Sequence, residues 1–534
     1  MRFFARRTNG TDTLSQVLGL AFLPGLFNCT TVNQPTVSTT SGELQGIDQD
    51  GVMSFKGVRF GQAPVGPLRW SPPVPFVSSE DVDATKLGPS CLQQFSDPLS
   101  AQLFNNPPPV EDEDCLFLER YSRNVWAPSG AQYGQLKPVV VWIYGGSLAF
   151  GTASLPAYDG TSIVKNQDVI IVTFNYRTNV LGFPGSPDLP INGNNLGFMD
   201  QELAFTWVQQ NIANFGGDPK QVTIMGQSAG SISVSAALVR HPQDAPFRAG
   251  ILFSGSTPDK IATPSFTAFD QFAAGVGCNQ TTGADRLGCL KAVPAAIIRT
   301  FTNGIGAPLS FMPVVDNSTL FANNFARIRS KQTARVPIFI GHTQDDGTLF
   351  TVGQTNLTEF LDNGIVSGVS PDLVRSLYPS LDDSQVIAAV FRDVAFGCPA
   401  SLWAGGYVQS GISSVFRYEY GAVFPDLQVF PNAGAWHATE LPELFGTFNA
   451  STATPDEVAL SSTFQTVVAN FIKNPDTSPA PNWEKYIPGA NTQTLAKLAY
   501  QGNVQRDNVV MPAQSDSADR PCEALWNKFL NFNQ

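Results

Sequence analysis

The chain has 534 residues, of which 43% are hydrophobic and 11% aromatic, so it contains enough apolar material for a large core and is not a disordered chain. The formal net charge is −12 and only 14% of the residues are charged, which argues against binding to the phosphate backbone of nucleic acids. No apolar run reaches the roughly 18 residues that a membrane-spanning helix needs. The composition therefore predicts a globular protein with no nucleic-acid partner and no transmembrane segment.

The N-terminal segment begins with basic residues and leads, after a polar stretch, into a short apolar run from Val17 to Leu23. This order is typical of a secretory signal peptide. We therefore interpret residues 1–32 as a signal peptide or N-terminal segment, which predicts a secreted, extracellular protein. A plain N-terminal tail without a targeting role is the alternative.

The cysteines and the glycosylation sequons agree with secretion. The chain has seven cysteines and no C-x-x-C pair, so the sequence predicts no zinc or redox motif. If Cys29 leaves with the N-terminal segment, six of the seven cysteines remain, and six can form three disulfides in an oxidising compartment. Sequons that mark candidate glycosylation sites occur at Asn279, Asn317, Asn356 and Asn449.

Short continuous apolar runs recur through the middle of the chain. Runs that are apolar on both faces are typical of buried parallel strands. They span residues 139–144, 169–174, 222–225, 250–253, 336–340 and 415–418, and residues 201–215 between the second and third runs predict a helix. This alternation predicts an α/β doubly wound sheet, in which ligands bind beyond the carboxyl ends of the strands.

The third apolar run leads into Gly226-Gln227-Ser228-Ala229-Gly230 and then into a helix-like stretch. This is a G-x-S-x-G motif in the strand–turn–helix context that presents a nucleophilic serine on a sharp turn. The two glycines let the backbone pack tightly while the serine hydroxyl projects. A plain strand–helix turn is the alternative, and the context favours Ser228 as a nucleophile.

The residues around this motif resemble the type-B carboxylesterase/lipase family, which includes fungal lipases and the cholinesterases. Residues 215–219 and 222–230 match the nucleophile signature of that family, and further similar stretches lie at residues 56–70, 113–118, 139–146, 174–183 and 521–530. The resemblance covers residues 35 to 534 and implies an α/β-hydrolase fold, with a mostly parallel central sheet and helical insertions. We therefore expect residues 33–534 to form a single domain of this kind, in a protein of fungal origin.

A serine nucleophile needs a base, and the base needs an orienting carboxylate. The chain has three histidines, His241, His342 and His437. Triad order in this fold is serine, acid, histidine. His437 has a long acid-bearing stretch between it and Ser228, and it matches the histidine motif of the family. The sequence therefore predicts His437 as the base.

The orienting acid is expected in the turn after the apolar run 336–340. The family usually reads Asp-Glu-Gly there, whereas this chain reads Asp345-Asp346-Gly347. Alignment with the motif puts Asp346 at the catalytic position, with Asp345 as the second candidate. The aspartate side chain is one methylene shorter than glutamate, so we expect the turn to lie closer to His437.

The resemblance also implies an oxyanion hole. The three-glycine motif of the family corresponds here to Gly145-Gly146-Ser147. The implied donors are the backbone N–H groups of Gly146, Ser147 and Ala229, which would stabilise the negative charge of a tetrahedral intermediate. Ser147 departs from the family by adding a side chain beside the reacting carbonyl.

Family pairing implies the disulfides Cys91–Cys115, Cys278–Cys289 and Cys398–Cys522. The first would close the loop 91–115, which is short and contains prolines 107 to 109. We interpret this loop as a rim of the active site more than a large flap. It contains no Trp, which argues against a cholinesterase-type cation site. Arg69 and Glu113 match a family salt bridge that anchors the loop.

Together these features predict a secreted serine hydrolase, a carboxylesterase or lipase, that acts on a small-molecule or lipid ester and needs no metal or organic cofactor. The same triad could pass the acyl group to an alcohol or amine, so an acyltransferase or lactonising biosynthetic enzyme is an alternative. A non-catalytic binding protein on the same fold is a further alternative. Such relatives typically lose the nucleophile or the histidine, and this chain keeps both.

Overall fold

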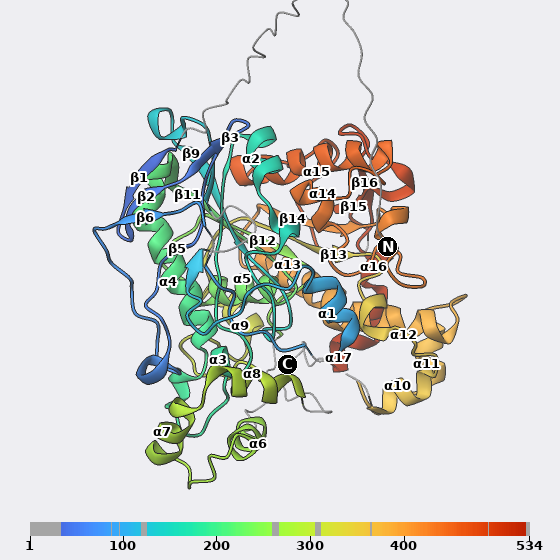
Figure 1. Cartoon of the computed structure of the whole chain (residues 1–534). Coiled ribbons are helices and arrows are strands. Elements are labelled where there is room, and N and C mark those ends of the chain that lie inside the picture. The colour runs from blue at the N-terminus through green and yellow to red at the C-terminus, as the bar shows by residue number, and fades with distance from the viewer. Residues whose placement is uncertain are drawn as a thin grey trace, which may run out of the picture.

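The computed structural model of the chain is built around one large β-sheet (Figure 1). It describes residues 34–86, 88–95, 97–118, 125–258, 266–304, 311–363, 366–489 and 491–529. The predicted N-terminal segment, residues 1–32, and Cys29 lie outside the described residues, so the signal peptide stays a prediction.

Within the described residues the large sheet has 11 strands in the order β16-β15-β14-β13-β12-β11-β9-β10-β8-β4-β3. The strands from β15 to β10 in this order are parallel, whereas β16 at one edge and β8, β4 and β3 at the other pair antiparallel. Their bounds are β3 Ile47–Gln49, β4 Val52–Phe55, β8 Val125–Pro128, β9 Lys137–Ile143, β10 Ile170–Thr173, β11 Gly217–Gln227, β12 Ala249–Phe253, β13 Ile338–Thr343, β14 Val415–Tyr420, β15 Leu495–Leu498 and β16 Val510–Ala513.

Two small sheets and a set of helices complete the described fold. The small sheets pair β1 (Thr36–Thr39), β2 (Gly42–Gln45) and β6 (Asp81–Asp83), and β5 (Val58–Arg59) with β7 (Phe117–Leu118). The α-helices are α1 Pro98–Phe104, α2 Thr161–Gln167, α3 Asn179–Gly182, α4 Leu196–Asn211, α5 Ala229–Arg240, α6 Thr267–Gly275, α7 Ala284–Ala292, α8 Ala295–Gly304, α9 Asn324–Arg329, α10 Leu357–Asn363, α11 Pro371–Leu377, α12 Asp383–Arg392, α13 Cys398–Gln409, α14 Leu441–Phe445, α15 Pro455–Lys473, α16 Asp516–Pro521 and α17 Asn527–Phe529.

The apolar runs of the sequence all lie in the parallel part of the sheet, in strands β9 to β14. The predicted helix 201–215 is α4 followed by the 3₁₀ turn η5 (Ile212–Phe215). These strands are buried on both sides, which is why they read as continuous apolar runs. The prediction of a mostly parallel α/β sheet is confirmed.

Helices cover both faces of the sheet, as β12 shows. A side chain at Gly250 would contact Val234 and Leu238 of α5. The ring of Phe253, three residues along the strand, packs against Phe464 of α15. Because successive side chains of a strand point to opposite faces, α5 and α15 lie on opposite sides of β12. The sheet is therefore doubly wound.

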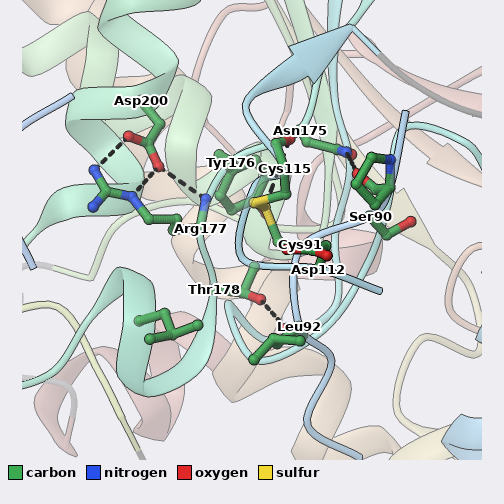
Figure 2. Close-up of a disulfide and its surroundings, with 12 residues drawn as sticks. Ser90, Cys91, Leu92, Asp112, Cys115, Asn175, Tyr176, Arg177, Thr178 and Asp200 are labelled. Atoms are coloured by element: carbon green, nitrogen blue, oxygen red, sulfur yellow. Dashed lines mark hydrogen bonds and ion pairs between the residues drawn. A yellow bond between two sulfur atoms is a disulfide. The ribbon is translucent and has the colours of Figure 1, made fainter. Parts of the chain in front are cut away.

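The three disulfides that the resemblance implied are all formed: Cys91–Cys115, Cys278–Cys289 and Cys398–Cys522. Figure 2 shows the first of them beside residues 175–178, which follow β10. There the Thr178 hydroxyl donates to the Leu92 carbonyl oxygen and the Arg177 guanidinium pairs with the buried Asp200. The predicted anchor is also present, because Arg69 forms a buried bidentate ion pair with Glu113 at 2.5 and 2.6 Å. The base of the loop 91–115 is thus fixed beside the carboxyl end of β10.

One helical stretch among the described residues, Asp383–Gln409, is long and apolar enough to cross a membrane, with a mean hydropathy of 1.4. In the fold 61% of its apolar 18-residue window is buried, as in a core helix of a soluble protein. It comprises α12, the π-helical turn η7 (Asp393–Gly397) and α13. Its length and composition are therefore explained by packing inside the molecule, and they are weak evidence for a membrane span.

Candidate active site

Ser228 lies at the tight turn between β11 and α5, at the carboxyl end of the central strand. Its backbone has φ 57° and ψ −125°, a conformation that is strained for a residue with a side chain. Its N–H donates to the Phe253 carbonyl oxygen of β12 at 2.9 Å, which fixes the turn to the sheet. Strain of this kind is usually kept at functional sites.

The two glycines of the motif are required by close packing. A side chain at Gly226 would collide with the backbone of Gly230, and one at Gly230 would collide with the Ile143 carbonyl oxygen of β9. The turn can therefore be this sharp only if both positions lack a Cβ. This is the tight packing that the G-x-S-x-G pattern predicts.

His437 and Asp346 meet at the carboxyl ends of β13 and β14. His437 Nδ1 lies 2.6 Å from Asp346 Oδ1, and the second carboxylate oxygen accepts from the Thr343 N–H at 3.1 Å. Both side chains are buried, at 3% and 0% exposure. An ionised carboxylate only accepts hydrogen bonds, so this contact holds the imidazole proton on Nδ1 and leaves Nε2 as the basic nitrogen.

The second candidate acid points elsewhere. Asp345 Oδ2 accepts from the Ala435 N–H at 2.9 Å, and the Asp345 backbone forms a β-bridge with Trp436. Burial raises the pKa of Asp345 above its ordinary value. The structure thus places Asp346, and not Asp345, against the imidazole of His437.

The other two histidines lie outside this cluster. His241 follows the last residue of α5, and its Nε2 lies 2.8 Å from Glu202 Oε2. His342 is buried in β13, where its Nδ1 contacts the Thr343 carbonyl oxygen at 3.0 Å. Neither lines the cavity that contains Ser228.

Gln227 is part of the site and was not singled out from the sequence. Its side-chain amide nitrogen lies 3.1 Å from His437 Nε2, the imidazole nitrogen that Asp346 does not contact. Among the described residues no hydrogen bond joins His437 to the Ser228 hydroxyl. The only available indication was its place beside the nucleophile in the motif, because the contact joins residues 210 positions apart.

The predicted oxyanion donors lie beside Ser228. Gly145 must be glycine, since a Cβ there would press on Gln227 and Ser228, and Gly146 has φ 113°, which favours glycine. Ser147, which replaces the family's third glycine, adopts φ 55° and is exposed. Gly146, Ser147 and Ser228 line one cavity, and Ala229 is the first residue of α5, where N–H groups lack helical partners.

The cavity beside Ser228 is small, about 40 Å³, and its wall combines six aromatic or aliphatic side chains with glycines and with polar side chains. Helix α1, blue in Figure 1, belongs to the loop 91–115 and contributes Ser100 and Phe104 to this wall. Leu99, Leu103 and Phe104 of α1 pack on a cluster that includes Leu349 and Trp436, the neighbours of the acid turn and of His437. The loop therefore forms part of the wall of the site. The residues lining the cavity are Ser100, Phe104, Gly145, Gly146, Ser147, Phe150, Gly151, Thr152, Leu155, Tyr158, Gln227, Ser228, Leu349, Phe350 and His437.

A buried glutamate lies behind the acid–histidine pair. Glu440 is fully buried, and neither of its carboxylate oxygens has a hydrogen-bond partner among the described residues. Burial, followed by the negative charge of Asp346, raises the pKa of Glu440 to about 8. The group is therefore mostly protonated at neutral pH and adds little second negative charge beside Asp346.

The described residues contain no group of three or more His, Cys, Asp or Glu side chains that could hold a metal ion. The predicted glycosylation residues Asn279, Asn317, Asn356 and Asn449 are all exposed.

The chain is similar to known carboxylesterases over most of its length. A model of the carboxylesterase family matches residues 33–375 and 380–514. The para-nitrobenzyl esterase of Bacillus subtilis (strain 168) is 33% identical over 472 residues, which cover 84% of this chain and 92% of that protein. The chlorogenic acid esterase of Aspergillus niger is 31% identical over 83% of each chain. Secreted lipase 5 of Gibberella zeae is 28% identical over 91% of this chain and 95% of that protein.

Proposed function

The chain belongs to the carboxylesterase family of carboxylic ester hydrolases, and from this premise we propose that it is a secreted esterase with Ser228 as nucleophile, His437 as base and Asp346 as orienting acid. The observation that carries the proposal is the 2.6 Å contact between Asp346 and His437, which gives a buried base facing the cavity of Ser228. We also propose that residues 33–534 act as one catalytic domain.

In the proposed reaction the Ser228 hydroxyl attacks the ester carbonyl while its proton passes to His437 Nε2. The N–H groups of Gly146, Ser147 and Ala229 then stabilise the oxyanion of the tetrahedral intermediate. His437 returns the proton to the leaving alcohol, which leaves an acyl group on Ser228. A water molecule, deprotonated by the same histidine, releases the acid.

The position of Gln227 adds one requirement to this sequence of steps. Its amide occupies His437 Nε2 in the free protein, so that contact must open before the Ser228 hydroxyl can donate to the same nitrogen. Gln227 and Ser228 both line the cavity. A substrate that enters it therefore lies beside the Gln227 amide and can displace this amide from His437 Nε2.

Secretion is supported by independent features. Three disulfides, including one that spans 124 residues, suit an oxidising compartment. The candidate glycosylation asparagines are exposed and so are accessible to modification. One of the relatives also bears the name of a secreted lipase.

The proposal is tested by hydrolysis of p-nitrophenyl esters with acyl chains from two to sixteen carbons (C2 to C16). We expect the wild-type protein to turn these esters over and Ser228→Ala to lose activity by roughly a million-fold. Ser330→Ala is the control variant. It also removes a serine hydroxyl, but Ser330 is exposed and does not line the cavity, so this variant should keep full activity. Equal activity in the wild type and Ser228→Ala would refute the assignment, and transfer of the acyl group to an added alcohol in place of hydrolysis would favour the acyltransferase alternative.

A further inference from the structure

The loop that follows β9 has an unusual backbone. We call residues 145–151 the oxyanion loop, because they include Gly146 and Ser147, two of the proposed oxyanion donors. Gly146 and Gly151 have φ values of 113° and 114°. Ser147 and Leu148 have φ values of 55° and 57°, in the left-handed region that residues with side chains seldom adopt. Such a backbone persists only where its surroundings hold it, so the contacts of this loop bear directly on the donors.

Gln93, from the loop 91–115, holds the end of the oxyanion loop. Its side-chain oxygen accepts from the Gly151 N–H at 2.6 Å, and its side-chain nitrogen donates to the Gly151 carbonyl oxygen at 3.0 Å. The same nitrogen donates to the Cys91 carbonyl oxygen at 2.7 Å, so this amide joins the two loops. Gln93 is buried. One buried side chain thus fixes both polar groups of a backbone residue that lines the cavity of Ser228.

Asn179 holds the middle of the oxyanion loop. Its backbone N–H donates to the Leu148 carbonyl oxygen at 2.7 Å. Its side-chain nitrogen donates to the carbonyl oxygen of Ala149 at 3.2 Å and to that of Leu92 at 2.6 Å. Because Leu92 belongs to the loop 91–115, the Asn179 amide is a second buried link between this loop and the oxyanion loop.

The backbone of Asn179 is itself in the left-handed region, with φ 48°. Glycine adopts this conformation without strain, so the backbone alone does not call for an asparagine. What asparagine adds over glycine is the side-chain amide, with its bonds to the carbonyl oxygens of Ala149 and Leu92. These bonds therefore offset the strain that the side chain brings to this position.

We propose that Gln93 and Asn179 are positioning residues that hold the oxyanion loop in its catalytic conformation. This inference rests on the proposed function. The N–H groups of Gly146 and Ser147 stabilise the oxyanion only if they point to the place where its charge develops. A shift of the loop by about 1 Å would misdirect these donors. Loss of either amide should therefore slow the chemical step and leave the binding of the ester almost unchanged.

The first test compares Asn179→Gly with Asn194→Gly. Asn179→Gly removes the amide and keeps a residue that tolerates the left-handed backbone. Asn194 is the matched control: it is fully buried, its amide nitrogen also donates to two carbonyl oxygens, those of Ser186 and Pro190, and it does not line the cavity. We expect Asn179→Gly to lower kcat for p-nitrophenyl butyrate roughly ten- to a hundredfold, with KM unchanged. Asn194→Gly should keep both constants and lose only thermal stability.

Inhibition by a trifluoromethyl ketone reports on the oxyanion loop directly. The Ser228 oxygen adds to the ketone carbon, its proton passes to His437, and the former carbonyl oxygen becomes an oxyanion in the same place as that of the ester intermediate. We expect the inhibition constant Ki of Asn179→Gly to rise by the factor by which kcat/KM falls. Ki of Asn194→Gly should equal that of the wild type. Wild-type kcat and Ki in Asn179→Gly, with only a lower melting temperature, would overturn the proposal.

If Asn179→Gly does not fold, Gln93→Met gives the same comparison. Methionine is similar in length and lacks the amide. Gln209→Met is its control, because the Gln209 amide donates to the carbonyl oxygens of Pro219 and Pro246 and does not line the cavity. A rise in KM at constant kcat in Gln93→Met would contradict a role in positioning. The proposed function fails separately: in that case wild type and Ser228→Ala would not differ in turnover.

Discussion

Asp345 and Asp346 are adjacent in the sequence and have opposite surroundings in the fold. Asp346 is fully buried and contacts the imidazole, whereas Asp345 is partly exposed and pairs with the backbone of residue 435. Because a carboxylate of the orienting type must hold one imidazole tautomer, only the residue that contacts Nδ1 can perform this role. The two aspartates therefore provide a matched pair of variants.

Asp346→Asn should lower kcat by roughly ten thousand-fold, because the amide can donate to Nδ1 and so favours the wrong tautomer. Asp345→Asn should keep activity within a few-fold, since its amide oxygen can still accept from the Ala435 N–H. Steady-state kinetics with p-nitrophenyl acetate measures both variants. A large loss in Asp345→Asn with little change in Asp346→Asn would reverse the assignment.

The site residues that belong to sequence motifs could be predicted, whereas those that contribute through their contacts in the fold could not. Ser228, Asp346 and His437 were each proposed from motif patterns, and the structure places Asp346 against His437 and lines one cavity with His437 and Ser228. Gln227 and Asn179 were not found, because their importance comes from contacts with distant parts of the chain that no local pattern records. A glutamine or an asparagine reads as an ordinary surface residue until its neighbours are known.

At the scale of elements, α14 packs on α15 and α15 packs on β14, and several buried carboxyl groups lie in this region. Glu440 precedes α14, Glu443 lies within it and Glu457 lies in the first turn of α15, and all are buried. Burial raises the pKa of each of these groups above its ordinary value, to about 8 for Glu440. The interface between these elements therefore favours the protonated acids.

This interface makes stability depend on pH. The folded protein binds the Glu440 proton more tightly than the unfolded chain does, since the pKa is about 8 in the fold and 4.5 ordinarily. The contribution of Glu440 to the free energy of unfolding is therefore fully present below pH 4.5 and is lost as the pH rises through about 8. The loss is on the order of a few kcal/mol once the group is ionised.

Glu440→Gln should remove this dependence, because the amide is neutral at every pH. We expect the melting temperatures of the variant and the wild type to differ little at pH 5, and the variant to be the more stable by several degrees at pH 9. Glu359→Gln, which changes an exposed carboxylate, is the control and should show no such divergence. If the melting temperatures of Glu440→Gln and the wild type changed with pH in parallel, the assignment of Glu440 as a neutral buried acid would be contradicted.

At the scale of the whole molecule, disulfides link distant segments. Cys398–Cys522 joins the first residue of α13, which directly follows η7, to the C-terminal turn η10 (Cys522–Trp526) across 124 residues, whereas Cys278–Cys289 closes a separation of only 11. A cross-link stabilises mainly by restricting the unfolded chain, and the effect grows with loop length. The long link also anchors η7, whose Phe396 ring contacts the imidazole of His437.

The double variant Cys398→Ser/Cys522→Ser should lose about 5 kcal/mol of unfolding free energy, and Cys278→Ser/Cys289→Ser about 3 kcal/mol. Urea unfolding followed by tryptophan fluorescence measures both. The larger loss should also be accompanied by lower esterase activity, because η7 is released from its anchor. Equal losses of unfolding free energy, or a larger loss in Cys278→Ser/Cys289→Ser, would contradict this reasoning.

The fold as a whole was largely predictable, and the reason is physical. Strands β9 to β14 are buried on both faces and so read as apolar runs, which the sequence analysis identified. The edge strands β3 and β16, and β15 beside β16, were not identified, because they are short and contain polar residues such as Asp48 and Lys497. Such strands are defined by the neighbour that they pair with, and a pairing partner is not visible in a local stretch of sequence.

The most direct test of the central claim is to identify the serine that acts as the nucleophile. The protein is treated with a fluorophosphonate, which reacts with activated serines, and the modified peptide is located by mass spectrometry. We predict one adduct on Ser228, no adduct in Ser228→Ala and slow labelling in His437→Ala. An adduct on another serine, or no adduct on a folded wild-type protein, would contradict the account.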